Sequence, residues 1–158
     1  MGDVAKVLVT GDKGYIGSVL TDILLRRGYA VMGVDTGYYK DCLVEPNSTT
    51  YSSIDRDIRD ISTLDLEGID SVVHLAALSN DPLGDFAPRL TEQINLEGTI
   101  RLAKCAREAG VQRLVYASSQ SMYGVSNTDH ELDEDDSDKN AITAYARTKW
   151  DAELALRK

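Results

Sequence analysis

Apolar residues in this chain gather in short runs that are separated by longer amphipathic stretches. The runs are rich in β-branched residues and carry almost no internal charge, as is typical of buried strands. We therefore predict strands at residues 6–10, 29–35, 70–78 and 112–119, with a weaker strand at 50–54.

The stretches between these runs show helical periodicity. Apolar residues recur at helical spacing over 15–27, and Gly28 follows as a C-cap. We also predict a long helix over 88–109, stopped by Gly110, and a final helix that begins near Ala141. Strands that alternate with helices need crossover connections, so the predicted fold is α/β, a doubly wound, Rossmann-like parallel sheet covered on both faces.

Length and composition indicate one globular domain. With 158 residues, 42% of them hydrophobic and 27% charged, the chain is long enough to bury a sizeable core. No apolar stretch reaches the roughly 18 residues of a membrane span and no secretory leader opens the chain, so we expect a cytoplasmic protein without a membrane partner. Cys42 and Cys105 lie far apart without a Cys-x-x-Cys motif; we expect both to be buried and to form neither a disulfide nor a zinc site.

The negative charge of the chain is local. The formal net charge is −9, but residues 129–138 (DHELDEDDSD) contain seven acidic side chains, which leaves about −2 for the remainder. We predict a solvated loop there rather than a metal site, because the run lacks the glycine and glutamate spacing of a calcium-binding loop. Nucleic acid is not an expected partner, because the chain has no basic stripe, and a small molecule is.

The first predicted strand leads into a glycine-rich turn, VTGDKGYIGS, in which Gly11, Gly14 and Gly17 are three residues apart. Without Cβ atoms these positions allow a tight turn, the approach of a pyrophosphate and close packing of the next helix. The free N–H groups and positive dipole end of that helix form an anion site. The turn predicts dinucleotide binding, although its spacing differs from Gly-x-Gly-x-x-Gly and a plain glycine turn is the alternative.

Asp35 ends the second predicted strand, 18 residues after Gly17. An acidic side chain at this place accepts hydrogen bonds from an adenosine ribose and repels a 2′-phosphate, which favours NAD over NADP. A turn aspartate that precedes Thr36 and Gly37 is the alternative.

Tyr145 and Lys149 in TAYARTKW are four residues apart, so their side chains share one face of the final helix. A free phenol titrates at about 10 and acts as a base at neutral pH only when its anion is stabilised. A cation at about 4 Å supplies roughly 4 kcal/mol of such stabilisation at an effective dielectric constant of about 20. The pair is a candidate reaction centre, with an ordinary helix surface as the alternative.

With these motifs in this order, the chain resembles the extended short-chain dehydrogenase/reductases, and within them the NAD-dependent nucleotide-sugar epimerase/dehydratase group. The motifs that carry the resemblance are TGDKGYIG (10–17), Asp35, DIRD (57–60), HLAA (74–77), Asn95 in INLEGT, SSQSMYG (118–124) and YARTK (145–149).

The resemblance implies a catalytic group of Ser119, Tyr145 and Lys149, in which Tyr145 is the base and Ser119 polarises the forming carbonyl. It also implies substrate contacts by Ser119, Gln120 and, in the predicted loop 79–88, Ser79, for which a turn role is the alternative. The residues that it implies for an NAD site are Gly11, Gly14, Tyr15, Ile16, Gly17, Asp35, Thr36, Asp57, Ile58, Leu75, Ala76, Ala77, Asn95, Tyr145 and Lys149.

The expected reaction is epimerisation of a nucleotide-sugar through a 4-keto intermediate. Members of the group that eliminate water carry an Asp-Glu pair after the catalytic Ser or Thr, where this chain has Gln120 and Ser121. A 4,6-dehydratase is therefore not expected. An oxidoreductase that acts on nucleotide-sugars or ketones stays open, and so does a non-catalytic NAD-sensing module, although such modules commonly lose the tyrosine and the lysine.

Members of the group continue well beyond this length with a sixth strand and a smaller substrate domain. We therefore expect residues 1–158 to be the NAD-binding part of a longer protein, with the strand at 112–119 exposed as a sheet edge. The resemblance also implies a homodimer through a four-helix bundle, built from the helix at 88–109 and the helix of Tyr145. His74 is expected to pack inside the protein and His130 to lie in the acidic loop.

Overall fold

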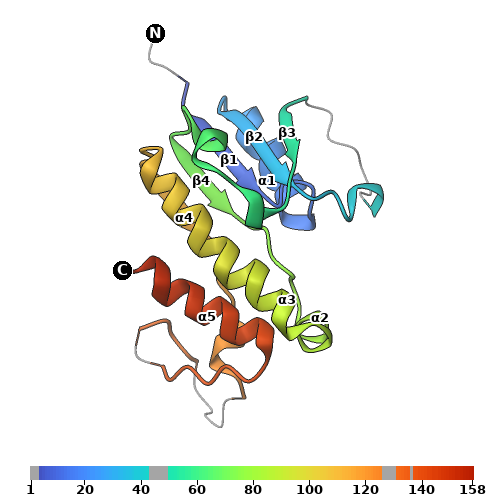
Figure 1. Cartoon of the computed structure of the whole chain (residues 1–158), viewed down its shortest axis with the longest axis vertical. Coiled ribbons are helices and arrows are strands. Elements are labelled where there is room, and N and C mark those ends of the chain that lie inside the picture. Colours follow the sequence, from blue (N-terminus) through green and yellow to red (C-terminus); the bar gives the residue numbers. More distant parts are fainter. Residues whose placement is uncertain (1–3, 43–49, 126–130, 136) are drawn as a thin grey trace.

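The computed structural model describes residues 4–42, 50–125, 131–135 and 137–158, in which five parallel strands form one sheet in the order β3-β2-β1-β4-β5 (Figure 1). The strands are β1 (Lys6–Thr10), β2 (Ala30–Asp35), β3 (Ser52–Asp55), β4 (Ser71–His74) and β5 (Arg113–Tyr116). The chain extends the sheet from β1 in one direction and then returns to extend it from β1 in the other. The predicted doubly wound α/β fold is therefore confirmed.

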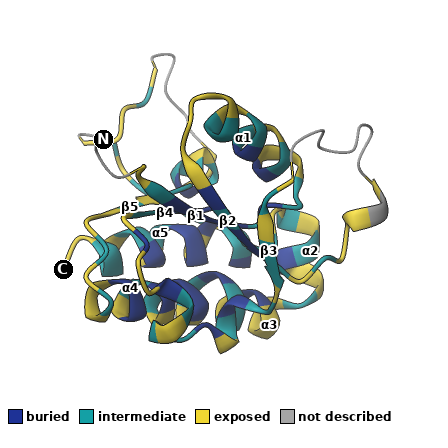
Figure 2. Cartoon of the chain, turned by 90° about the horizontal axis from the view of Figure 1, so that it is seen from above, coloured by how far each residue is buried: buried dark blue, intermediate teal, exposed yellow. Residues whose placement is uncertain are grey.

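Helices cover both faces of this sheet (Figure 2). Helix α1 (Tyr15–Arg26) lies on one face, while α3 (Pro88–Glu92), α4 (Thr99–Glu108) and α5 (Ala144–Leu156) lie on the other. A short helix, α2 (Asp81–Phe86), packs against α3 and α5. Single turns complete the path: η1 (Lys40–Cys42), η2 (Ile58–Asp60), η3 (Thr63–Leu66) and η5 (Gln120–Tyr123).

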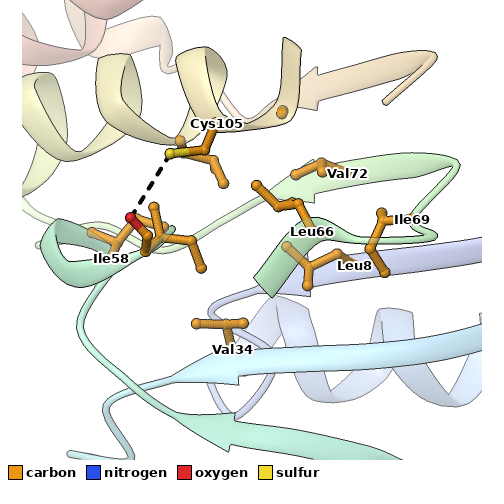
Figure 3. Packing of buried hydrophobic residues seen from close by; sticks show 10 residues of the cluster. Leu8, Val34, Ile58, Leu66, Ile69, Val72 and Cys105 are labelled. Atoms are coloured by element: carbon orange, nitrogen blue, oxygen red, sulfur yellow. Dashed lines mark hydrogen bonds between the residues drawn. The ribbon is translucent and has the colours of Figure 1, made fainter. Parts of the chain in front are cut away.

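Successive side chains of β1 point into two separate cores. Val7 and Val9 pack against the apolar side of α1, whereas Leu8 lies in the larger core on the side of α4. Figure 3 shows Leu8 in that larger core with Val34, Ile58, Leu66, Ile69, Val72 and Cys105. Because β1 is buried on both faces, its residues form a continuous apolar run rather than an alternating one.

The predicted helix over 88–109 is one continuous rod with an unpredicted irregularity. Between α3 and α4 the backbone forms a π-helical turn, η4 (Gln93–Gly98). At Gly98 a Cβ atom would lie 2.9 Å from Cγ2 of Ile58, so glycine lets the rod pack closely on η2. Hydrophobic spacing predicts such a helix but carries no signal for a single wide turn.

The prediction that residues 79–88 form a loop is wrong, because they contain α2. The Asn80 side chain caps this helix by accepting a hydrogen bond from the Leu83 amide at 2.9 Å. Pro82 lies in the first turn, where its missing N–H leaves no hydrogen bond unmade. Strands β4 and β5 also end earlier than predicted, at His74 and Tyr116, because the chain turns there into a cleft.

Three smaller predictions have mixed outcomes. Cys105 is buried as expected, but Cys42 is exposed, because η1 lies on the surface beyond β2. The described acidic residues of 129–138 are exposed, as predicted for a solvated loop, and His130 lies outside the described residues. Within the described part of the chain, no helix is long and apolar enough to cross a membrane.

Candidate functional site

A cleft of about 980 Å3 runs along the carboxyl ends of the strands. Its wall is formed by the glycine turn after β1, the end of β2, residues 75–79 after β4 and residues 117–118 after β5, joined by two side chains of α5. The chain leaves β1 and β4 toward opposite faces of the sheet, so a crevice opens between them. This topological switch point is where open α/β sheets bind ligands.

The floor of the cleft is the turn that joins β1 to α1. Gly11 has φ +76°, and a Cβ atom there would lie 2.8 Å from the Ala76 amide nitrogen. At Gly17 a Cβ atom would lie 2.0 Å from the Gly11 carbonyl oxygen. Both positions therefore require glycine, and the start of α1 faces the cleft with its N-terminal backbone.

Asp12 lies beneath this turn and has no contact with solvent. Its Oδ2 atom accepts hydrogen bonds from the hydroxyl groups of Tyr51 and Ser53, both at 2.9 Å. Gly33 leaves room for the carboxyl group, since a Cβ atom there would lie 2.2 Å from Oδ2. Burial raises the pKa of Asp12, and its hydrogen bonds to Ser53 and Tyr51 oppose that shift.

Asp35 lines the cleft where β2 ends. One of its carboxylate oxygens accepts from the Gly37 amide at 2.7 Å and the other from the Lys13 amide at 3.2 Å. The turn role and the cleft role that the sequence left open therefore coexist at this residue. The Lys13 ammonium forms an ion pair with Asp55 of β3, which raises the pKa of Lys13.

Asp57 lines the next part of the cleft, between β3 and η2. It caps η2 by accepting from the Arg59 amide at 2.8 Å. The Arg59 guanidinium donates to both of its oxygens, at 3.0 and 2.8 Å, and holds the pKa of Asp57 below its ordinary value. The neighbouring Ile58 lines the cleft and also belongs to the larger core, which fixes this wall.

Tyr145 lies in the first turn of α5, whose start is held by α2. The Thr143 hydroxyl caps α5 by accepting from the Ala146 amide at 3.0 Å and donates to Asp81 of α2 at 2.5 Å. A Cβ atom at Gly84 would lie 2.9 Å from the Tyr145 amide nitrogen, so glycine permits this close approach of the two helices.

Lys149 lies one turn further along α5, and both side chains line the cleft, as their spacing predicts. Only 4% of Lys149 is exposed. Its ammonium donates to the Ala117 carbonyl oxygen at 2.8 Å and lies 5.9 Å from the centre of the Tyr145 ring. Burial lowers the pKa of Lys149 to about 8.

Most of the residues named from the sequence line this one cleft. They are Gly11, Gly14, Tyr15, Ile16, Gly17, Asp35, Thr36, Asp57, Ile58, Leu75, Ala76, Ala77, Ser79, Tyr145 and Lys149.

Asn95, Ser119 and Gln120 are not part of the lining. The Asn95 side chain is buried and bonds to both backbone groups of Leu78, at 2.8 and 3.1 Å, so it supports the cleft wall from behind. The Ser119 hydroxyl accepts from the Ser121 amide at 3.2 Å and caps η5, one residue beyond the lining residue Ser118. The cleft therefore gathers the cofactor residues more completely than the substrate residues.

His74 is wholly buried, as predicted for a packed residue. Its ring nitrogens lie 2.6 Å from the Thr10 hydroxyl and 2.8 Å from the Thr99 hydroxyl, which ties β1 and β4 to α4. Burial lowers the pKa of His74 to about 3, so the ring is neutral.

Three parts of the site were missed by sequence reasoning. Asp12 was not singled out from the sequence, and Gly84 was placed in the predicted loop 79–88. Tyr116 of β5 was not named as a site residue, yet it lies against Lys149. Of these three residues, only Gly84 lies in a segment with a usable sequence signal, because the Asn80 cap followed by Pro82 marks the start of α2. The contacts of Asp12 and Tyr116 join residues far apart in the chain.

Comparison with known proteins shows the family of this chain. A sequence model of the NAD dependent epimerase/dehydratase family matches residues 7–158. The UDP-glucose 4-epimerase of Mycolicibacterium smegmatis is 36% identical over an alignment that covers 75% of this chain and 40% of that protein. The dTDP-D-glucose 4,6-dehydratase of Mus musculus is 36% identical, with coverage of 99% of this chain and 46% of that protein.

A solved structure shares the fold at similar identity. The UDP-glucose-4-epimerase of Stenotrophomonas maltophila, solved with bound NAD and formylated UDP-arabinopyranose, superposes with a TM-score of 0.84 at 32% identity. The match covers 97% of this chain and 48% of that one. This chain therefore spans less than half the length of these three proteins.

Proposed function

The chain belongs to the NAD dependent epimerase/dehydratase family, and we propose that it is the NAD-binding part of a nucleotide-sugar epimerase. The observation that carries the proposal is the cleft in which the glycine turn, Asp35, Tyr145 and the buried Lys149 meet. A sensing module needs the first two features but has no use for a buried ammonium one turn from a tyrosine.

The described residues fit an NAD molecule. The close approaches at Gly11 and Gly17 leave the N-terminus of α1 open to the cleft, where N–H groups and the helix dipole favour a pyrophosphate. Asp35 would hold the adenosine ribose and disfavour a 2′-phosphate, and Asp57 with Ile58 would bind the adenine. Residues 75–77, Tyr145 and Lys149 would line the nicotinamide end.

A bound NAD would supply the acceptor, and then the donor, of a hydride exchanged with a sugar carbon. The chain would supply the proton chemistry: Tyr145 takes the proton of the sugar hydroxyl, and the Lys149 ammonium stabilises the resulting phenolate. Ser119 would polarise the forming carbonyl, which needs its hydroxyl to turn from the η5 cap into the cleft. Epimerisation requires no further acid or base, which agrees with Gln120 and Ser121 at the positions that follow.

The test replaces Tyr145 by Phe in the full-length protein, with UDP-glucose as the first nucleotide-sugar probe. We expect turnover to fall by about 100-fold or more, with NAD affinity changed little, because the ring remains. Tyr29→Phe is the control, since Tyr29 is 41% exposed and is not among the residues of the cleft. Unchanged turnover in Tyr145→Phe would refute the catalytic assignment of Tyr145, whereas NAD binding without any turnover in the wild type would favour a sensing role.

The same assay separates epimerisation from the other reactions open to this family. An epimerase converts its sugar without net formation of NADH, whereas an oxidoreductase accumulates NADH in proportion to product. A dehydratase, as in the mouse relative, would release a 4-keto sugar that has lost water. We also propose a homodimer through a four-helix bundle, built from the rod of α3, η4 and α4 and from α5, which sedimentation of the full-length protein would reveal.

A further inference from the structure

Lys149 carries a buried positive charge that is not balanced by a carboxylate in the described part of the chain. The residue is 4% exposed and makes no ion pair with a described carboxylate. Its ammonium donates a hydrogen bond to a neutral acceptor, the Ala117 carbonyl oxygen. An isolated buried ammonium is costly, so something else must stabilise it.

The closest aromatic partner of this ammonium is Tyr116, on β5. Lys149 Nζ lies 4.9 Å from the centre of the Tyr116 ring, nearer than the 5.9 Å to the Tyr145 ring. A cation within about 6 Å of a ring centre is attracted by the electron-rich face. Tyr116 therefore contributes part of the stabilisation that a carboxylate would otherwise provide.

The hydroxyl group of Tyr116 does not explain why this residue is a tyrosine. It is buried and has no hydrogen-bond partner in the described chain, and burial raises its pKa, so it remains a neutral phenol. The ring, by contrast, has two neighbours: Lys149, and His74 at 5.6 Å between ring centres. The interaction that this position supplies is thus the ring face.

The other titratable groups near this contact do not replace it. His74 is neutral, because burial lowers its pKa to about 3. Asp151, the next acid along α5, is exposed to solvent. Glu153, one half-turn further on, accepts from the Ser118 hydroxyl at 2.7 Å and pairs with Arg157. Tyr145 lies on the cleft side of Lys149 and is the proposed base. No described acid is therefore free to take over the role of the Tyr116 ring.

We propose that Tyr116 is a positioning residue, whose ring keeps Lys149 protonated and holds its ammonium beside Tyr145. This inference rests on the proposed function only for the next step, in which Lys149 stabilises the Tyr145 phenolate. The contact itself is a property of this chain. Its consequence is that a lysine buried without an acid remains charged at neutral pH, where it is needed to stabilise a phenolate.

The test weakens the ring face without changing its shape. Tyr116 is replaced by Phe and, by unnatural amino-acid incorporation, by 3,4,5-trifluorophenylalanine, whose fluorine atoms withdraw electrons from the ring. The full-length protein is labelled with [ε-13C]lysine and titrated without NAD, and the Lys149 signal is identified by its loss in Lys149→Arg. Thermal unfolding of each variant serves as the folding control.

We expect the pKa of Lys149 to be unchanged in Tyr116→Phe and to fall by about one unit with trifluorophenylalanine. A purely structural role would leave this pKa the same in both variants, and that result would overturn the proposal. So would a fall of equal size in Tyr116→Phe, because it would assign the effect to the hydroxyl. The readout needs no turnover, so failure of the proposed function would not affect it.

Discussion

The turn after β1 places two carboxylates in opposite environments. Asp12 has no exposure and lies under the turn with its pKa raised by burial, whereas Asp35 faces the cleft and binds two backbone amides. The difference follows from where each strand ends, since Gly33 of β2 makes room for one carboxyl group. Asp12 therefore supports the turn, and Asp35 is left facing the cleft, where we propose that it selects between cofactors.

Replacing Asp35 by Asn should relax the choice between NAD and NADP. The change removes a negative charge where a 2′-phosphate would lie, next to Lys13. We expect NADP affinity to rise about 10- to 100-fold relative to NAD, measured by calorimetry on the full-length protein. Asp60→Asn is the control, because Asp60 is exposed and outside the cleft lining. An unchanged ratio would assign Asp35 to the turn alone.

His74 should make folding stability fall at acid pH. Burial lowers its pKa from 6.5 to about 3, so the folded state favours the neutral ring. The stabilisation is complete above the unfolded pKa and is lost as the pH falls from 6.5 toward 3. Urea unfolding of the wild type and of His74→Gln should differ by an amount that declines by up to about 1.4 kcal/mol per pH unit in that window. A pH-independent difference would contradict this account.

At the scale of elements, periodicity predicted the strands and the long helices but not the contacts between them. The runs that form β1 and β2 are apolar because both faces of these strands are buried. Such a continuous apolar run can be recognised from the sequence alone. The π-helical turn η4 and the packing of α2 on α5 depend on Asn95 meeting Leu78 and on Gly84 meeting Tyr145. Such contacts join distant residues, so no local pattern could predict them.

The same limit applied to the candidate site. Gly11, Gly17 and Asp35 were identified because a dinucleotide turn has a local spacing, and Tyr145 with Lys149 because a helix repeats every turn. Tyr116 was not identified, because its contact with Lys149 crosses from β5 to α5. Local motifs therefore predicted the residues that face the cleft, while those that act from behind it needed the fold.

The junction of β1 and α1 should be far less tolerant than the end of α1. Gly17→Ala would place a Cβ atom 2.0 Å from the Gly11 carbonyl oxygen, so the helix must shift away from the turn. We expect a loss of about 2 kcal/mol or more in the free energy of unfolding, together with loss of NAD binding.

Gly28 provides the matched comparison. It has φ +84°, but no atom lies within 4 Å of its Cβ position, and Asn tolerates such backbone angles. Gly28→Asn should therefore retain NAD binding and most of the stability, as measured by urea unfolding. Equal losses in the two variants would contradict the special role assigned to the close approach at Gly17.

At the scale of the whole molecule, β5 forms one edge of the sheet that the described residues build. Val115 on this strand is 49% exposed, although it lies in the middle of an apolar run. A groove of about 710 Å3 lies on the opposite face of β5, lined by Leu114 and Tyr116 of this strand and by the C-terminal halves of α4 and α5. Exposed sheet edges with apolar side chains favour association. The β5 edge is therefore the part of the described chain most prone to associate with another surface.

The cleft and the edge together predict how residues 1–158 should behave when expressed alone. The residues proposed to bind NAD lie within this chain, and most of them line one cleft. Of the proposed sugar contacts, Ser79 and Gln120 are exposed and the Ser119 hydroxyl faces its own helix cap. A sugar that contacts only one open wall stays hydrated. That water weakens the electrostatic interactions between the sugar and the preorganised catalytic groups.

We therefore expect residues 1–158 to bind NAD, as measured by calorimetry, and to convert UDP-glucose at least about 1000-fold more slowly than the full-length protein. Lys149→Met in the same fragment should weaken NAD binding, because a residue proposed to line the nicotinamide end of the cleft loses its ammonium. Turnover by the fragment at the full-length rate would show that this chain alone holds the sugar. Failure of a folded fragment to bind NAD would instead place part of the cofactor site outside these residues.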